Sequence, residues 1–415
     1  MTSFFKILHR SKKTFARTGV IHTPHGDITT PAFVPVATQA TIKGITMEEF
    51  RAIGASSLLC NTYHLYLRPG DKRVKRFGGL HAFMGWDGPI WTDSGGFQAF
   101  SLGAGMEHGV SKVGKVENLE YTTSSLRHTN KLEYVGMSLR TNNKSFVKIS
   151  EDGVEFRSHI DGSEHFFTSE RSMQVQKNLG ADIVFAFDEC TSPTHSYAYT
   201  KRSMERTHRW AKRSLREFQR LAEKGKRSQF LFGIIQGGDH KDLREQSAFA
   251  INAIDFDGVG IGGYVGDSKA KLYRVLDWVL PHCDDSKPRH LLGIGGVSDI
   301  FEAVERGVDT FDCVIPTRCG RNGTVLTREG MLHLGNAAFR EDKRPIETGC
   351  VCYACSHATR AYLSHLFRAS EMLGPILATI HNLSFVERLM HDIREAIAHN
   401  GLARVKRKYR KAVCL

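Results

Sequence analysis

Three cysteines and one histidine near the carboxyl end have the residue types and spacing of a metal site. Cys350, Cys352 and Cys355 lie within six positions of one another, and His381 follows them. Three thiolates and one imidazole complete the tetrahedral shell that Zn²⁺ takes in structural sites. Because the protein fills all four positions, we expect one structural zinc per chain, which folds the C-terminal segment and performs no catalysis.

The fourth ligand of this set has two competitors, His357 and His365. We prefer His381, because it precedes an amphipathic segment that it would bring onto the metal. A zinc deaminase uses similar ligands, but it also needs a Glu two residues after its ligating His. None of the 20 histidines is followed by Glu at that offset, so we exclude a deaminase.

Acidic and amide side chains end several apolar runs. Asp93 lies in WTDSGGFQ, Asp188 in FDEC and Asp312 in FDCVIPTR, while Gln236 follows Gly-Ile-Ile. In a parallel barrel the C-terminal ends of all strands face one mouth, where these four side chains would converge. Two carboxylates about 5 Å apart across a sugar serve as nucleophile and proton donor. A single such Asp more often caps a helix, but three at strand ends favour a catalytic site.

Glycines and arginines accompany these acids. The segment 258–263 matches the dinucleotide pattern GxGxxG, but its glycines lie within an apolar run and no helix follows at once. We interpret Gly262 and Gly263 as places where the backbone approaches a flat heterocycle. Arg318 and Arg321 follow Asp312 by six and nine residues. They are suited to phosphates or bases beside that acid, although a solvated loop would look the same.

The elements that must position these residues alternate along the chain. Eight short apolar runs that end in turn residues are typical of strands buried on both faces. They are 31–38, 56–62, 89–95, 183–189, 230–236, 256–263, 289–296 and 310–317. Segments with helical spacing lie between most of them, at 46–52, 170–179, 201–224, 241–252, 268–280 and 298–306. This alternation predicts a (β/α)8 TIM barrel, with a doubly wound sheet as the alternative.

Two regions depart from this alternation of strands and helices, and they divide the chain into three predicted parts. The connection after the third strand carries an insertion at about 101–165, whose first part, to about residue 148, is polar and basic. Its second part predicts an antiparallel meander through 147–149 and 154–156. We therefore expect a barrel over 1–318, a zinc-binding subdomain over 319–384, and a returning barrel helix with a basic tail over 385–415. The insertion either helps to build the active site or is an inert decoration.

The C-terminal part predicts two helical segments separated by Gly374-Pro375, the second with an apolar stripe. The basic run 406–411 is either a solvated tail or an additional phosphate contact.

Composition and charge narrow the class of protein further. The 415 residues carry 57 Lys and Arg against 44 Asp and Glu, a formal charge of +13. Such an excess favours a polyanionic partner such as nucleic acid, although it also serves solubility alone. The longest apolar runs last about five residues, far from the ~20 that span a bilayer. Nine cysteines without a hydrophobic signal region argue against a disulfide framework and favour a cytoplasmic protein without membrane association.

Taken together, the motifs resemble those of the tRNA-guanine transglycosylases, also called queuine tRNA-ribosyltransferases. The matching segments are TDSGGFQ at 92–98, FDEC at 187–190, GIIQGG at 233–238, FDCVIPTR at 311–318 and the Cys3His set. They occur in family order and span most of the chain. The resemblance implies a (β/α)8 barrel with a zinc subdomain that exchanges guanine 34, at the anticodon wobble position of tRNA, for a 7-deazaguanine in queuosine biosynthesis.

The resemblance also implies roles for individual residues. By motif position, Asp312 resembles the nucleophile and Asp93 the general acid/base. The implied substrate-binding residues are Ser94, Gly95, Gly96, Phe97, Asp188, Cys190, Gln236, Gly262 and Gly263. The implied RNA-binding residues are Leu291, Leu292, Gly293, Ile294, Gly295, Gly296, Val297, Thr317, Arg318, Cys319, Gly320 and Arg321. The implied partners are tRNA with a G-U-N anticodon, the deazaguanine base and, in a homodimer, a second copy; no nucleotide cofactor is required.

Two departures from the family pattern concern the incoming base and the insertion. Cys190 resembles bacterial enzymes that take 7-aminomethyl-7-deazaguanine, whereas the loop 262–266 is one residue shorter than the common bacterial form and would make room for queuine. We favour the aminomethyl base. The insertion is longer than the usual family connection. A non-catalytic tRNA-binding partner subunit and an ordinary glycoside hydrolase are the competing classes, and the presence of both Asp93 and Asp312 argues against the subunit.

Overall fold

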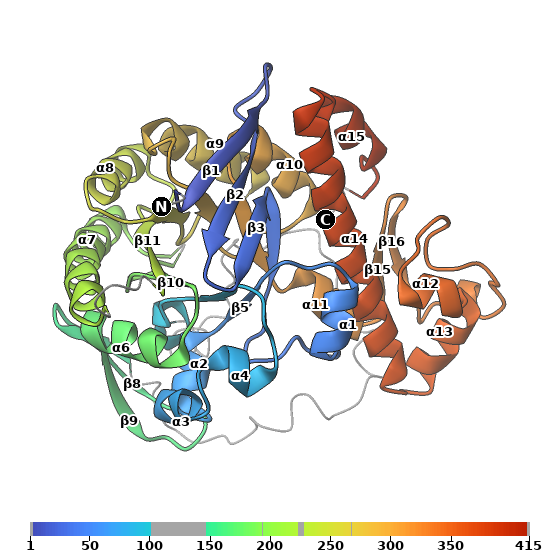
Figure 1. Cartoon of the computed structure of the whole chain (residues 1–415), viewed down its shortest axis with the longest axis horizontal. Helices are drawn as coiled ribbons and strands as arrows, with labels where there is room; N and C mark the ends of the chain where they lie inside the picture. Colours follow the sequence, from blue (N-terminus) through green and yellow to red (C-terminus); the bar gives the residue numbers. More distant parts are fainter. Residues whose placement is uncertain (1–2, 101–146, 193, 223–227, 267, 413–415) are drawn as a thin grey trace.

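Eight parallel strands form the centre of the structure, a computed structural model that describes residues 3–100, 147–192, 194–222, 228–266 and 268–412 (Figure 1). The strands are β4 (Ala32–Pro35), β5 (Leu58–Cys60), β6 (Ile90–Thr92), β10 (Ile183–Phe185), β11 (Phe230–Ile235), β12 (Gly258–Ile261), β13 (Arg289–Leu291) and β14 (Thr310–Cys313). Their order is β4-β14-β13-β12-β11-β10-β6-β5. A parallel bridge between Val36 and Leu59 joins the two end strands. All eight predicted strands are therefore confirmed, and the barrel replaces the doubly wound alternative.

Helices surround this barrel (Figure 1). They are α1 (Met47–Ala52), α2 (Thr62–Leu67), α3 (Asp71–Arg76), α4 (Leu80–Met84), α6 (Ser169–Leu179), α7 (Tyr197–Arg220), α8 (Lys241–Asn252), α9 (Lys269–Val279), α10 (Val297–Glu305) and α11 (Ile315–Arg321), with a 3₁₀ turn, η2 (Leu280–His282), after α9. Residues 96–100 are also helical. The side chains of Thr168, Ser196 and Ser268 accept a backbone N–H at the start of α6, α7 and α9, which fixes where these helices begin.

The predicted last strand, 310–317, is too long. It ends at Cys313, and α11 begins at Ile315 with Pro316 in its first turn. Proline suits this position, because the first N–H groups of a helix have no partner within the helix.

An antiparallel sheet that sequence analysis missed closes the N-terminal end of the barrel. It consists of β1 (Phe5–Arg10), β2 (Arg17–Thr23) and β3 (Gly26–Thr30). Phe5, Ile21 and Ile28 are buried in the same apolar cluster as barrel residues, including Trp91 and Phe232. The predicted acids lie at the opposite, C-terminal ends of the barrel strands.

The predicted meander after the third strand is confirmed. β7 (Val147–Ile149), β8 (Gly153–Arg157) and β9 (Glu164–Thr168) form an antiparallel sheet in that order. Phe156 and Phe167 anchor it in the main core. The rest of the predicted insertion, 101–146, lies outside the described residues, so both readings of its role stay predictions.

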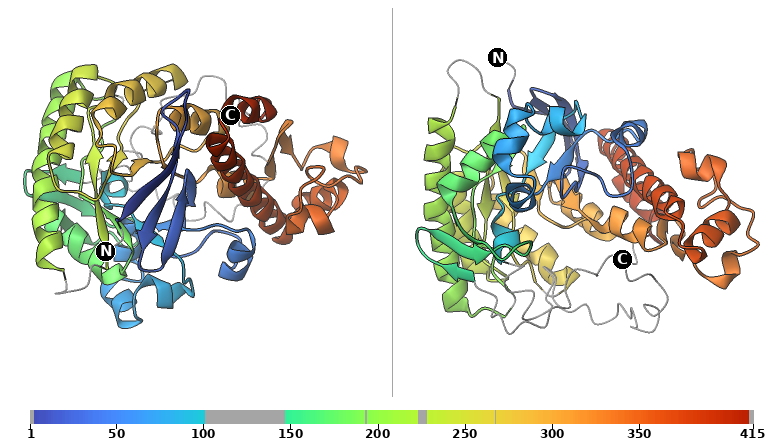
Figure 2. Two further views of the ribbon diagram at one scale, coloured as in Figure 1. Left: turned by 45° about the horizontal axis from the view of Figure 1, so that its top comes forward. Right: turned by 90° about the horizontal axis from the view of Figure 1, so that it is seen from below.

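The C-terminal part forms a lobe beside the barrel (Figure 2). Its elements are β15 (Thr324–Thr327), β16 (Gly330–His333), the 3₁₀ turn η3 (Ala337–Phe339), α12 (Tyr353–His357), α13 (Arg360–Arg368), α14 (Leu373–Ala398) and α15 (Leu402–Lys408). The expected break at Gly374-Pro375 is wrong: both residues lie in the first turn of α14, where proline is tolerated. The predicted boundary at 384/385 falls inside this helix, which also carries the apolar stripe.

Part of the basic C-terminal run is helical and paired with acidic side chains. Residues 402–408 form α15, and Lys406 donates to Glu302 at 2.8 Å and Glu305 at 2.6 Å on α10. Lys408 donates to Asp392 of α14 at 2.8 Å. Lys406 and Lys408 therefore attach the end of the chain to α10 and α14, and a phosphate contact by this run stays a prediction. Among the described residues, no helix is both long enough and apolar enough to cross a membrane.

One buried amide joins the C-terminal lobe to the barrel. Asn382 of α14 accepts the backbone N–H of Leu326 at 2.8 Å and donates to the carbonyls of Pro316 and Thr324, each at 3.0 Å. Pro316 belongs to the helix that follows the last barrel strand, whereas the other two partners lie on β15. The Asn382 side chain therefore holds α11, α14 and β15 together.

Asn382→Ala should lower the free energy of unfolding by about 2 to 4 kcal/mol, because it leaves one buried N–H and two buried carbonyls without this partner. Chemical denaturation measures the loss. Ser384→Ala is the matched control on the same helix, since its hydroxyl donates only to the carbonyl of Ile380 one turn earlier. Equal stability of the two variants would show that Asn382 does not make this connection.

Candidate active site and metal centre

Asp93 follows β6 at the C-terminal mouth of the barrel and is held by the start of α2. Its carboxylate accepts a hydrogen bond from the Asn61 side chain, the backbone N–H of Thr62 at 2.8 Å and the Gln98 side chain at 2.8 Å. Thr62 also donates its hydroxyl to the Asp93 carbonyl at 2.5 Å. The sequence analysis missed Asn61, although it lies near the end of the predicted second strand, as Asp93 lies near the end of the third.

Asp312 lies on β14 at the same mouth, with 13% of its side chain exposed. Its Oδ1 accepts the backbone N–H of Gly293 at 2.7 Å and lies 3.1 Å from Nε2 of His290. His290 is fully buried, bonds Thr310 through Nδ1 at 2.9 Å and stacks on Trp91. Sequence analysis missed His290 because a histidine within an apolar strand has no local signature of a site.

The two acids influence each other electrostatically. Burial raises the pKa of the Asp93 carboxyl, and the negative charge of Asp312 acts in the same direction. The hydrogen bonds from Asn61, Thr62 and Gln98 oppose this rise. A carboxyl whose pKa is subject to these opposing effects can both give and accept a proton.

Asp188 forms the centre of a second polar group at the mouth. Its buried carboxylate accepts the hydroxyl of Ser94 and the side-chain amide of Gln236, each at 2.7 Å. Oε1 of Gln236 is buried and accepts no hydrogen bond from the described residues. A buried acceptor of this kind is suited to an N–H group of a ligand.

Glycines let the backbone pack closely around this group. A side chain on Gly96 would put its Cβ 2.5 Å from the Asp188 carbonyl, and Gly95 has a φ of +80°. A Cβ on Gly263 would lie 2.1 Å from Oε1 of Gln236. Phe97, in the helical segment that follows these glycines, is half-buried.

Arg244 of α8 holds the loops after β11 and β12 together, and sequence analysis missed it too. The guanidinium is fully buried and donates to the carbonyls of Gly238 at 2.6 Å, Ile235 at 3.0 Å, Gly262 at 2.9 Å and Tyr264 at 2.9 Å. Burial lowers the pKa of Arg244 to about 10. The Gly262 N–H also donates to the Ile235 carbonyl at 3.1 Å, and the Gly262 carbonyl, which can accept a second hydrogen bond, is bonded by Arg244; the predicted approach of a heterocycle to this backbone stays a prediction.

Cys190 follows Asp188 at the end of β10 and is half-buried, with its Sγ 3.8 Å from the Thr191 carbonyl. The buried Glu189 between them fixes this segment: it accepts hydrogen bonds from Tyr199 at 2.8 Å and Arg206 at 2.5 Å, both on α7.

The stretch 291–297, predicted to hold RNA, contains both partly exposed and buried residues. Leu292 and Gly293 are partly exposed, whereas Leu291, Ile294, Gly295, Gly296 and Val297 are buried. A Cβ on Gly295 would lie 2.5 Å from Cβ of Cys313, so this glycine is needed for packing. The exposed part of the loop is the part next to Asp312.

The second predicted RNA stretch, 317–321, lies on α11. Arg318 is exposed, Cys319 and Arg321 are half-buried, and Thr317 and Gly320 are buried. Thr317 donates to the Val314 carbonyl at 3.2 Å. A Cβ on Gly320 would lie 2.8 Å from Cα of Thr379, so this glycine allows α11 to pack against α14. Arg318 is the residue of this stretch that faces solvent.

The Cys3His group comes together as predicted. Nδ1 of His381 lies 3.9 Å from Sγ of Cys350, 3.6 Å from Cys352 and 3.3 Å from Cys355. Nε2 of the fully buried His381 lies 2.8 Å from the Leu326 carbonyl. This bond to the carbonyl places the proton on Nε2 and leaves Nδ1 for a metal. The donor set and its convergence fit a structural metal ion.

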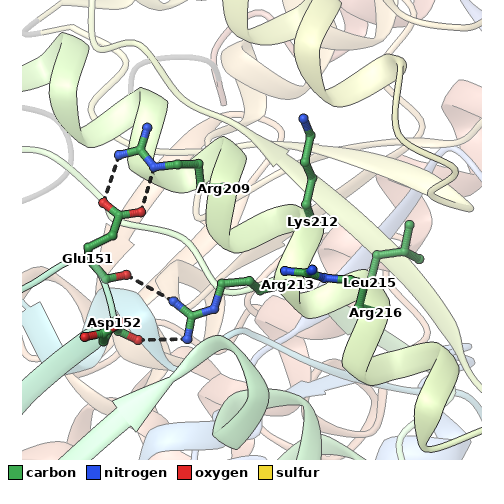
Figure 3. Close-up of a pocket in the computed structure, with 7 residues that line it drawn as sticks. All are labelled: Glu151, Asp152, Arg209, Lys212, Arg213, Leu215 and Arg216. Atoms are coloured by element: carbon green, nitrogen blue, oxygen red, sulfur yellow. Dashed lines mark hydrogen bonds and ion pairs between the residues drawn. The ribbon is translucent and has the colours of Figure 1, made fainter.

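A hollow of about 660 Å³ lies between α7 and the turn that joins β7 to β8 (Figure 3). It is lined by Glu151, Asp152, Arg209, Lys212, Arg213, Leu215 and Arg216. Arg209 pairs with the Glu151 carboxylate at 2.6 and 2.9 Å, and Arg213 donates to the carbonyls of Glu151 and Asp152, each at 3.0 Å. These contacts attach the β7–β8 turn to α7 and include none of the predicted site residues.

The geometry defines a TIM barrel with two interacting acids at its mouth and a Cys3His group in its C-terminal lobe. The family model described as queuine tRNA-ribosyltransferase matches residues 11–126 and 117–413. The chain is 46% identical to the queuine tRNA-ribosyltransferase of Caldanaerobacter subterraneus over 98% of its length and 96% of the relative's. It is 47% identical to that of Pelotomaculum thermopropionicum over 99% of both chains, and 46% identical to that of Staphylococcus aureus over 96% of this chain and 93% of the other.

The chain therefore belongs to the queuine tRNA-ribosyltransferase family. Members of this family are pentosyltransferases, the tRNA-guanine transglycosylases of the queuosine pathway.

Cys352→Ser should abolish metal binding by the Cys3His group and lower the unfolding temperature of the C-terminal lobe, because three ligands hold a structural metal far more weakly than four. After substitution with Co²⁺, the thiolate charge-transfer absorption reports this site alone. Cys283→Ser is the control, since Cys283 is buried beside α9, outside the group. An unchanged cobalt spectrum in Cys352→Ser would exclude Cys352 as a ligand.

Proposed function

We propose that the chain exchanges guanine at wobble position 34 of G-U-N tRNAs for 7-aminomethyl-7-deazaguanine through a covalent enzyme–ribose intermediate. The main support is the pair Asp312 and Asp93, which approach the barrel mouth from β14 and β6 and influence each other electrostatically. Family membership supports the tRNA substrate.

Asp312 acts as the nucleophile. A carboxylate oxygen of Asp312 attacks C1′ of the ribose while the C1′–N9 bond to guanine breaks, so an ester forms as the base leaves. The Gly293 N–H and His290 hold Oδ1, which orients the carboxylate. In the second half, N9 of the incoming base attacks C1′ and the ester bond breaks. Two inversions retain the configuration at C1′.

Asp93 moves the proton. It protonates guanine as the base departs and later takes the N9 proton of the incoming base, so the two halves leave its charge unchanged. The raised pKa of Asp93 suits the first step, because a larger fraction of the carboxyl carries a proton than in a solvated aspartate.

The group around Asp188 recognises the base. Asp188 and Gln236 offer a carboxylate and an unpartnered carbonyl oxygen to the N–H groups of a guanine edge, and Phe97 provides a ring for stacking. Arg244 acts indirectly, by holding the two loops that carry Gln236 and Gly262. Cys190 resembles the bacterial enzymes that take the aminomethyl base, which favours this base as the substrate. The short loop 262–266 would make room for queuine, which remains the alternative.

We infer the tRNA contacts from the exposed residues near Asp312 and from the net charge of the chain. Leu292 and Gly293 border Asp312, and Arg318 is exposed on α11. Unstacking the wobble nucleotide costs a few kcal/mol, which contacts between phosphates and a chain of charge +13 would offset.

The Cys3His group holds Zn²⁺, one ion per chain, and we expect the enzyme to act as a cytoplasmic homodimer.

Two other functions make different predictions. A non-catalytic tRNA-binding subunit would bind tRNA without exchanging a base, and a glycoside hydrolase would release guanine to water without inserting a new base. Incorporation of labelled guanine into tRNA distinguishes the transferase from both.

Asp312→Asn should lower guanine exchange by on the order of a thousandfold or more, because the nucleophile is lost while the barrel is retained. It should also abolish the denaturation-resistant protein–RNA adduct that the wild type forms with tRNA and a deazaguanine inhibitor. Denaturing electrophoresis with labelled tRNA measures the adduct. Asp277→Asn, which removes an outer-surface ion pair with Arg306, should keep both properties. An Asp312→Asn variant with normal exchange would refute the proposed nucleophile.

Asn61→Ala should move the acidic limb of the pH profile of kcat/KM for the incoming base to higher pH, because in that half of the reaction Asp93 must be ionised to take the N9 proton. The Asn61 hydrogen bond lowers the pKa of Asp93, so its removal raises that pKa, and the ionised carboxylate is then lost at a higher pH as the solution is acidified. Exchange rates measured across the acidic range test this, with Asn178→Ala, which bonds Asp71 away from the mouth, as the control. A downward shift of the limb in Asn61→Ala would contradict this role of Asp93.

A further inference from the structure

A basic and partly aromatic surface lies on α3 and α4, and it contains none of the predicted site residues. Its exposed side chains are those of Lys72, Arg73, Lys75, Arg76, Phe77 and Phe83, which together we name the α3 surface. The segment 72–83 contains no Asp or Glu. The cations of this surface are therefore not neutralised by acids close to them in the sequence.

The short helix α3 turns its four cations to one side. At 3.6 residues per turn, the positions 72, 73, 75 and 76 cover an arc of roughly 160°. Asp71 and Val74 occupy the other side of the helix and are buried. The Asp71 carboxylate accepts hydrogen bonds from Asn178 at 2.6 Å and Arg171 at 3.1 Å, both on α6. These contacts hold α3 with its basic side toward solvent.

The crowding of these cations is unfavourable within the chain itself. Residues 72 and 75, 72 and 76, and 73 and 76 are three or four positions apart, where like charges destabilise a helix. None of the four side chains hydrogen-bonds or pairs with an acid among the described residues. The helix dipole favours cations in the last turn, but it does not remove their mutual repulsion. An anionic partner would remove it.

Two exposed aromatic rings lie next to the cations. Phe77 directly follows α3 and is 62% exposed, and Phe83 of α4 is 38% exposed. Their ring centroids are 5.8 Å apart, with the planes at 69°. Cations beside accessible aromatic rings suit RNA, because the cations bind phosphates and the rings stack on unpaired bases. An acidic protein surface would use the cations but would leave the rings without a matching group.

Helix α6 connects the α3 surface to the barrel mouth. Ser172 of α6 donates to the carbonyl of Ser94, the residue after Asp93, at 2.6 Å, and the adjacent Arg171 bonds Asp71. Helix α3 lies beside α6 (Figure 1). The α3 surface therefore lies on the outer wall of the part of the barrel that carries Asp93, where an RNA that enters the mouth with one nucleotide can extend.

We propose that the α3 surface binds the tRNA substrate at a part of the molecule outside the nucleotide in the barrel mouth. Its four cations neutralise backbone phosphates and release the condensed counterions, and Phe77 stacks on an unpaired base. This inference rests on the proposed tRNA substrate. It does not depend on the proposed roles of Asp312 and Asp93 in the chemical steps.

The test compares two double variants that each remove one Lys and one Arg four positions apart. Lys72→Gln/Arg76→Gln changes the α3 surface. Lys212→Gln/Arg216→Gln is the matched control on α7, because these two cations are also exposed and pair with no acid among the described residues. Binding of full-length tRNA to the full chain is measured at several salt concentrations, and circular dichroism checks that both variants fold.

Lys72→Gln/Arg76→Gln should weaken tRNA binding by about tenfold or more at moderate salt. The slope of log affinity against log salt should become shallower by about 1.5, because each phosphate contact contributes roughly 0.7–0.9. The α7 control should keep the wild-type slope and affinity. In guanine exchange, the α3 variant should raise KM for tRNA and leave kcat unchanged, because it removes no group from the mouth.

Phe77→Ala should weaken tRNA binding by about fivefold or more, because it removes a stacking platform. Phe249→Ala is its control, since Phe249 is 60% exposed on α8, far along the chain from this surface. Unchanged tRNA binding in Phe77→Ala would overturn the stacking role of the ring.

Equal loss of affinity in the two double variants would overturn the proposal, because net charge and not a local contact would then explain the binding. Unchanged binding by Lys72→Gln/Arg76→Gln would overturn it as well and would assign the α3 surface to a partner other than tRNA. With a wild-type chain that binds tRNA and exchanges guanine, either outcome refutes the α3 surface alone. A wild-type chain that does not bind tRNA would refute the proposed substrate together with this surface.

Discussion

The closure of a parallel barrel is the constraint on which the rest of the structure depends. Strands β14 and β6 have β4 and β5 between them in the sheet order, so Asp312 and Asp93 approach the mouth from different sides. Only the curvature of the barrel brings two acids that are 219 positions apart close enough for one charge to raise the pKa of the other. A flat sheet with the same strands would leave them apart.

Each acid is then oriented by groups from a neighbouring strand end. The loops after β5 and β13 supply Asn61 to one carboxylate and the Gly293 N–H to the other. The group around Asp188 is supported in the same way, since Arg244 binds carbonyls from the loops after both β11 and β12. Backbone groups and buried side chains thus hold in place the two acids that we propose to react, as electrostatic preorganisation requires.

Helix α14 connects the two predicted sites. His381 directs one face of the helix toward the three cysteines, and the adjacent Asn382 bonds β15 and the helix that follows β14. Gly320 lets α11 pack closely against this helix. The helix that carries the Cys3His ligand His381 therefore also supports α11, whose exposed surface carries Arg318.

The sequence by itself determined the features that depend on local pattern: eight buried strands from apolar runs that end in turn residues, and the Cys3His set from its spacing. It also indicated which strand ends carry acids. Tertiary structure alone decided the N-terminal sheet, the start of α14 before Gly374, and the contributions of Asn61, His290 and Arg244. The physical reason is that periodicity and short motifs are properties of neighbouring residues. A hydrogen bond between Asn61 and Asp93, or between Arg244 and Gly262, exists only after the chain has folded and brought distant positions together.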